Sequence, residues 1–77
     1  MSDLPCVSGK TMVRLLESLG WRVIRIQGSH HILHKAGVGV PFPVPVHGNQ
    51  DVKIGTLRRI LKQAGLTDEE FTSALEK

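Results

Sequence analysis

The alternation of proline with apolar residues at 40–46, Val-Pro-Phe-Pro-Val-Pro-Val, is the feature that most constrains the fold. In an antiparallel strand, residues i and i+2 point their N–H groups toward the same neighbouring strand, and proline has no N–H group. Pro41, Pro43 and Pro45 therefore remove the donors along one side of the segment, while the residues between them keep donors for the other side. The pattern predicts an edge strand whose free side is blocked against further pairing.

A hairpin is predicted just upstream, where Gly28-Ser29 joins two segments with strand character, Trp21–Gln27 and His31–Ala36. A two-residue connection that begins with Gly is typical of a II′ turn, because Gly adopts the positive φ required at the first central position. The next turn is expected at Gly37-Val38-Gly39, immediately before the proline-rich strand.

The register of this hairpin assigns side chains to the two faces of the sheet. With a two-residue turn, Gln27 pairs with His30, and His30 shares a face with Arg25 and His34. The opposite face is expected to lie under the helices and to carry Ile24, Ile26 and Leu33, with Ile24 paired to Leu33.

Two amphipathic helices flank the strands, because apolar residues recur at i, i+3, i+4 and i+7. Ser8 is expected to cap the first helix and Gly20 to end it. The second helix is expected from about Lys53 to Ala64, before Gly65. A T-x-x-E capping box at 67–70 predicts a short third helix, with Phe71, Ala74 and Leu75 as its contacts. The apolar stripes are Met12, Leu15, Leu16, Leu19 and Leu57, Ile60, Leu61, Ala64.

Length and element order define the predicted architecture. A chain of 77 residues has room for one domain with one core, here residues 1–77, with residues 1–7 as a loose N-terminal tail. The order α-β-β-β-α with a short C-terminal helix predicts an α+β fold, in which a three-stranded antiparallel sheet carries its two main helices on one face. Trp21, next to the end of the first helix, is expected to anchor the core, in preference to stacking on a base.

The charge distribution is uneven along the chain. The whole chain has ten Lys and Arg residues and seven Asp and Glu residues, but residues 9–65 contain nine basic residues and two acidic ones. This asymmetry favours a polyanionic partner, although ordinary surface solvation gives the same pattern. A lone Cys6 excludes an intrachain disulfide. No segment has the ~20 apolar residues of a membrane span or the pattern of a signal peptide, so we expect a cytoplasmic protein with no membrane partner.

His30 is the principal candidate for chemistry. An imidazole held at a tight turn beside Arg25 suits proton transfer at a phosphate, although a solvated turn histidine is the plainer interpretation. His30 and His34 share a face, but four residues of strand span about 13 Å, so both cannot bind one metal ion. We therefore expect no metal and no cofactor. Ser29 lacks the separate base and acid of a hydrolase triad. For His47 two interpretations stay open: it makes a hydrogen bond within its turn, or it is a second catalytic group.

Several motifs occur together in an order and spacing that resemble a known family. They are S-G-K at the start of the first helix, L-G-W at its end, G-S-H-H-I at the hairpin, V-P-V-H-G-N after the third strand, and G-T-L-R-R-I-L-K-Q-A-G-L along the second helix. Over roughly residues 8–71 the chain resembles the HicA (YcfA-like) family of toxin–antitoxin mRNA interferases. The resemblance implies a fold like that of a double-stranded RNA-binding domain, and it places the family's essential histidine at His30. The proline-rich strand and Ile26 depart from the family's usual pattern.

The resemblance also implies a function and two partners. It implies a metal-independent endoribonuclease that cuts mRNA and stops translation, with His30 as catalytic acid or base, and a HicB-type antitoxin that covers His30. Two alternatives stay open: a non-catalytic RNA-binding module of the same fold, and a domain that binds only protein. The residues expected to contact RNA are Ser29, Arg25, Lys53, Arg58, Arg59 and Lys62, with His47 as a second catalytic or positioning group.

Overall fold

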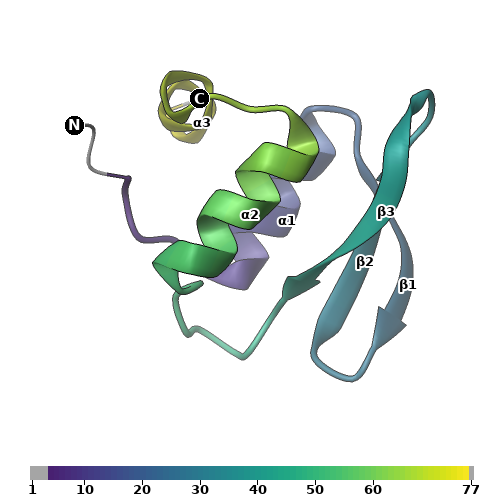
Figure 1. Ribbon diagram of the computed structural model, residues 1–77. Coiled ribbons are helices and arrows are strands. Elements are labelled where there is room, and N and C mark those ends of the chain that lie inside the picture. The colour runs from purple at the N-terminus through teal and green to yellow at the C-terminus, as the bar shows by residue number, and fades with distance from the viewer. Residues whose placement is uncertain (1–3, 77) are drawn as a thin grey trace.

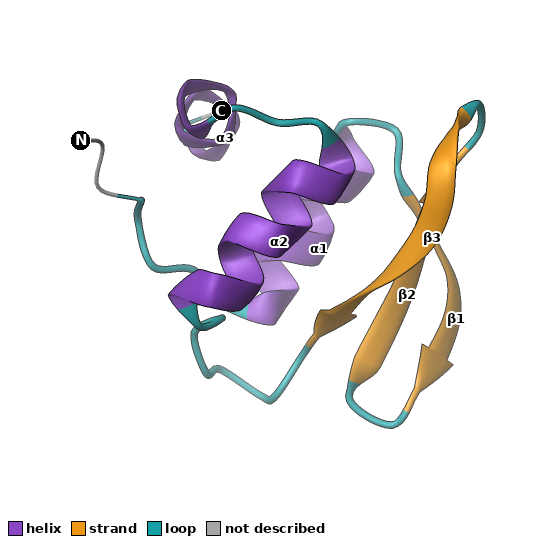
Figure 2. Cartoon of the chain, in the orientation of Figure 1, coloured by secondary structure: helices purple, strands orange, loops and turns teal. Residues whose placement is uncertain are grey.

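The computed structural model describes residues 4–76 and shows three helices on one side of a three-stranded antiparallel sheet (Figures 1 and 2). This confirms the predicted α+β fold, with the α-β-β-β-α order of a double-stranded RNA-binding domain followed by a third helix. None of the helices in the described part of the chain is long and apolar enough to cross a membrane. In chain order the elements are α1 (Gly9–Ser18), β1 (Arg22–Gln27), β2 (His30–Lys35), β3 (Val38–Pro45), α2 (Ile54–Ala64) and α3 (Asp68–Leu75).

The proline-rich strand lies at the edge of the sheet, as predicted. The sheet order is β1-β2-β3, so β3 has β2 as its one neighbour. Val44 is opposite His31, and the Val46 N–H donates to the Ser29 carbonyl at 2.6 Å. Pro43 and Pro45 occupy the alternate positions of this register, where the missing N–H groups face away from β2. The strand begins at Val38, two residues earlier than expected, because the preceding turn is at 36–37.

The β1–β2 hairpin has the predicted two-residue turn. Gly28 has a φ of 58°, and none of the described residues other than glycine has a positive φ, so Ser29 keeps a negative one. A positive φ at the first central position alone is what a II′ turn requires. The predicted pairing of Gln27 with His30 is confirmed.

The pairing predicted for Ile24 is wrong. The register shifts between Val23 and Arg25, so Leu33 lies opposite Val23 and Ile24 is the extra residue of a bulge. Ile24 is 55% exposed and Ile26 is 59% exposed, although both were expected under the helices. Ile26 keeps its predicted face, opposite His31, but it lies near the hairpin turn, which projects beyond the helices (Figure 1).

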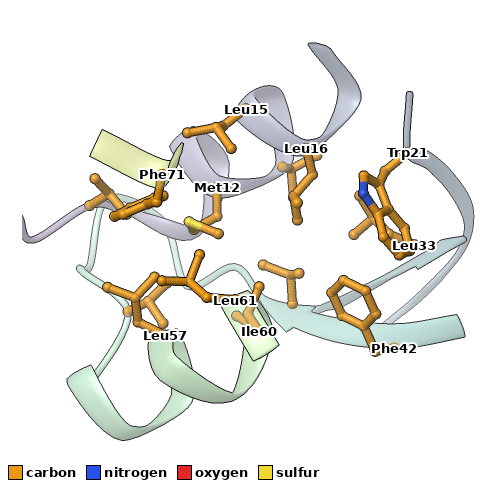
Figure 3. Packing of buried hydrophobic residues seen from close by; sticks show 14 residues of the cluster. Met12, Leu15, Leu16, Trp21, Leu33, Phe42, Leu57, Ile60, Leu61 and Phe71 are labelled. Carbon is orange, nitrogen blue, oxygen red and sulfur yellow. The ribbon is translucent and has the colours of Figure 1, made fainter. Parts of the chain in front are cut away.

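The core lies between the two main helices and strands β2 and β3 (Figure 3). Trp21 is 3% exposed and meets Phe42 edge to face, with ring centroids 4.9 Å apart, so its predicted role as a core anchor is confirmed. No residue of β1 belongs to the buried core. The core consists of Val7, Met12, Val13, Leu15, Leu16, Trp21, Leu33, Phe42, Val44, Val52, Leu57, Ile60, Leu61 and Phe71.

The predicted helix ends are confirmed. The Ser8 hydroxyl accepts from the Thr11 N–H at 3.2 Å and caps α1. Gly65 takes the left-handed conformation that ends α2, with a φ of 73°. Thr67 and Glu70 form both hydrogen bonds of the capping box that starts α3. The helix ends could be predicted from the sequence because each one depends on residues within one turn of the helix.

The expectation of a loose N-terminal tail is wrong at Val7. This side chain is 8% exposed, and its carbonyl accepts from the Val52 N–H at 2.8 Å. Leu4 also packs against the core. The interaction joins segments 45 residues apart, from Val7 to Val52, and no local pattern predicts it. Residues 1–3 of the expected tail lie outside the described residues.

Gly9 and Gly55 provide a matched test of this packing, because both lie in the first turn of a helix. A methyl group at Gly9 would overlap the Pro45 carbonyl oxygen and approach the Val46 Cα to 2.9 Å, whereas one at Gly55 would meet nothing within 4 Å. We expect Gly9→Ala to lower the free energy of unfolding by about 1–3 kcal/mol, and Gly55→Ala to raise it by about 0.4–1 kcal/mol. Urea denaturation measures both. Equal effects of the two substitutions would contradict the close packing at Gly9.

Candidate functional site

Three segments distant in sequence meet at the end of β3 and position the candidate site. Ser8 forms an isolated antiparallel bridge with Asp51, beside the hydrogen bond between Val7 and Val52. Gly9 lies directly against Pro45. These contacts fix both ends of the loop at 46–53, which connects β3 to α2 (Figure 1).

A cleft of about 270 Å³ opens between the end of β3, this loop and the first turns of α2. The sheet contributes His30 and two prolines, the loop contributes most of the polar groups, and α2 contributes one hydroxyl and one guanidinium. Its lining residues are His30, Pro43, Pro45, His47, Gln50, Asp51, Val52, Lys53, Thr56 and Arg59.

The local fold explains how His30 reaches this cleft. His30 is the first residue of β2, and the register places it opposite Gln27 on one side and Pro45 on the other. Pro45 is followed within two residues by His47, which is also exposed. The two imidazoles therefore line one cleft, although 17 residues separate His30 from His47.

The cleft combines groups that transfer protons with groups that attract anions. His30 and His47 supply imidazoles, and Lys53 and Arg59 supply permanent positive charges. A lysine and an arginine together can hold a phosphate while an adjacent imidazole exchanges a proton with it. Asp51 adds one carboxylate to the lining.

Four of the sequence-predicted site residues come together in this cleft: His30, His47, Lys53 and Arg59. The other four do not line it. Arg25 lies in β1 opposite Ile32, and the Ser29 carbonyl accepts from the Val46 N–H.

The remaining two predicted site residues, Arg58 and Lys62, lie elsewhere on α2. The Arg58 guanidinium is 3.9 Å from the Asp68 carboxylate at the start of α3. Lys62 is in the last turn of the helix, while the cleft lies at its first turns. Of the three basic residues of α2, all exposed, Arg59 alone lines the cleft.

Sequence reasoning missed six lining residues, and for three of them a signal was present. The register of β3 places Pro43 and Pro45 on the same face as His30, so the strand pattern could have identified both. Asp51 lies between His47 and Lys53 in one short loop. The other three missed residues are Gln50, Val52 and Thr56, which no motif marked.

His31 lies on the opposite face from His30, as predicted. It is half-buried in a second cleft beside α1, lined by Lys10, Val13, Arg14, Glu17, His31 and Val46. Its Nδ1 atom is buried without a hydrogen-bond partner. His31 therefore belongs to the packing between β2 and α1, and it does not contribute to the cleft at His30.

No group of three or more His, Cys, Asp or Glu side chains within the described residues is arranged to hold a metal ion. His34 shares the sheet face of His30 but lies opposite Arg22, away from the cleft. The chemistry that the cleft itself offers is proton transfer and anion binding.

The family model described as the HicA toxin of bacterial toxin–antitoxin matches residues 9–66. The matched region runs from the start of α1 to just beyond α2 and contains every residue that lines the cleft. No curated protein matches the chain.

Proposed function

Because this chain belongs to the HicA toxin family of bacterial toxin–antitoxin systems, we propose that it is an endoribonuclease that cuts mRNA and so stops translation. The observation that carries the proposal is the cleft itself, in which His30 and His47 lie together with Lys53 and Arg59. Since mRNA is the proposed substrate, the proposed place of action is the cytoplasm.

The proposed reaction is a transfer of the phosphoryl group to the neighbouring ribose oxygen. His30 takes the proton from the 2′-OH, and the 2′ oxygen forms a bond to the adjacent phosphorus. The bond from phosphorus to the 5′ oxygen of the next nucleotide breaks, and His47 donates a proton to that oxygen. The products are a 2′,3′-cyclic phosphate and a free 5′-OH, so two imidazoles supply both proton transfers.

The proposed roles of the basic residues follow from their positions. Lys53 and Arg59 line the cleft and are placed to hold the reacting phosphate, where positive charge stabilises the charge that develops during the reaction. Arg25, on the same face of the sheet as His30, is placed to contact RNA farther along the strand. Such phosphate contacts position the RNA without selecting its sequence.

The antitoxin that membership of the family implies is proposed to inhibit by covering the cleft. His30, His47 and Arg59 are all exposed, so a partner with acidic or bulky side chains can reach them. A partner seated there would exclude RNA directly, because both would compete for the same positive charges.

Substitution of His30 tests the proposed chemistry. We expect His30→Ala to slow cleavage of single-stranded RNA by about 10²–10⁴-fold, measured with EDTA present. The fold should be retained, because His30 is exposed and leaves no core cavity. His34→Ala is the matched control, since it removes an imidazole from the same strand and the same face outside the cleft. Cleavage by His30→Ala at the wild-type rate would exclude His30, while RNA binding without cleavage by the wild type would favour the non-catalytic RNA-binding module.

A pair of charge reversals tests which arginine contacts RNA. Arg59→Glu and Arg58→Glu change the net charge equally on adjacent residues of α2, but Arg59 lines the cleft and Arg58 faces Asp68. We expect Arg59→Glu to weaken RNA binding more than Arg58→Glu. It should also reduce the slope of log Kd against log salt by about one. Titrations of the His30→Ala protein at several salt concentrations measure both quantities, and equal losses for the two variants would place the RNA elsewhere.

A further inference from the structure

The two edges of the sheet differ in what they can bind. On β3, the outer edge has prolines at 41, 43 and 45, so an added strand would find no N–H donors along that stretch. On β1, no described segment pairs with the outer side. The strand β1 is therefore the one edge of this sheet to which another strand can be added.

The outer side of β1 presents both hydrogen-bonding groups and apolar side chains. Gln27 and His30 flank the two-residue turn and pair with each other, so the N–H and C=O of Ile26 point away from β2. Ile26 and Ile24 are 59% and 55% exposed. An edge with free backbone groups and exposed branched side chains is a template for strand addition.

Charge on β1 selects the kind of strand that can be added. Arg22 and Arg25 are exposed on this strand, and the chain carries a net charge of +3. A second copy paired through β1 would bring two sets of these arginines onto one short edge, and like charges on paired strands destabilise the pairing. An acidic strand with apolar residues at alternate positions instead complements both the arginines and the isoleucines.

We propose that the antitoxin adds an acidic, partly apolar strand to the outer edge of β1. This inference rests on the antitoxin partner in the proposed function and is independent of the ribonuclease chemistry. Adjacent strands lie about 4.8 Å apart, so an added strand would lie two strand spacings, about 10 Å, from β2 and His30. A partner anchored on β1 is therefore well placed to extend across the sheet face and cover the cleft.

Amide hydrogen exchange of Ile26 tests the proposed backbone pairing. Its N–H should exchange rapidly in the free toxin and at least about tenfold more slowly in the complex with the cognate antitoxin. The His30→Ala protein is used for both samples, so that neither depends on catalysis. Unchanged exchange at Ile26 in the saturated complex would overturn the proposal.

Binding measurements with matched variants test the same edge independently. We expect Ile26→Lys to weaken antitoxin binding at least tenfold and Val40→Lys to leave it unchanged, because Val40 is 72% exposed but lies on the blocked strand β3. Both variants made with His30 intact should cleave RNA at the wild-type rate, which separates loss of docking from loss of the active cleft. Equal binding by Ile26→Lys and Val40→Lys would overturn the proposal, as would a toxin dimer that Ile26→Lys dissociates.

Discussion

The contact between the start of α1 and the end of β3 is the constraint on which the rest of the structure depends. Gly9 packs against the Pro45 carbonyl, and the adjacent Val7 carbonyl accepts from the Val52 N–H. Together these contacts hold the sheet, the loop at 46–53 and the start of α2 at one place. The cleft opens there, between the end of β3, this loop and the first turns of α2. The proposed chemistry thus depends on backbone packing as well as on the side chains that carry it.

One-sided hydrogen bonding of β3 makes the two edges of the sheet different. Pro43 and Pro45 stop the sheet from extending past β3, and the same two residues form a wall of the cleft. The opposite edge, β1, keeps its free backbone groups and carries exposed Ile26. The two proposed partners, RNA and an antitoxin, therefore have separate surfaces, a cleft on one side and a strand edge on the other, with β2 between them.

The sequence predicts those features whose causes are local. The Gly28 turn, the edge position of β3 and the Thr67 capping box each follow from residues a few positions apart, and all agree with the structure. The face of Ile24 could not be predicted, because a bulge changes the register without a glycine or proline to mark it. Which residues line the cleft could not be predicted from local sequence either, because they come from segments that are distant along the chain. Arg58 and Arg59 are consecutive on α2, but Arg59 lines the cleft and Arg58 lies beside Asp68. Their side chains differ in direction because successive residues of an α-helix point about 100° apart.

In the proposed reaction, His30 and His47 transfer protons during attack by a ribose 2′-OH. The chemical groups at the ends of the cut RNA test this reaction most directly. The measurement compares one RNA oligonucleotide with the same oligonucleotide that lacks the 2′-OH at the cleaved position. Mass spectrometry should find a 2′,3′-cyclic phosphate and a 5′-OH on the products of the first, and the second should stay intact, because its attacking oxygen is missing. Cleavage of the deoxy substrate, or products that end in a 3′-OH and a 5′-phosphate, would contradict the roles assigned to His30 and His47.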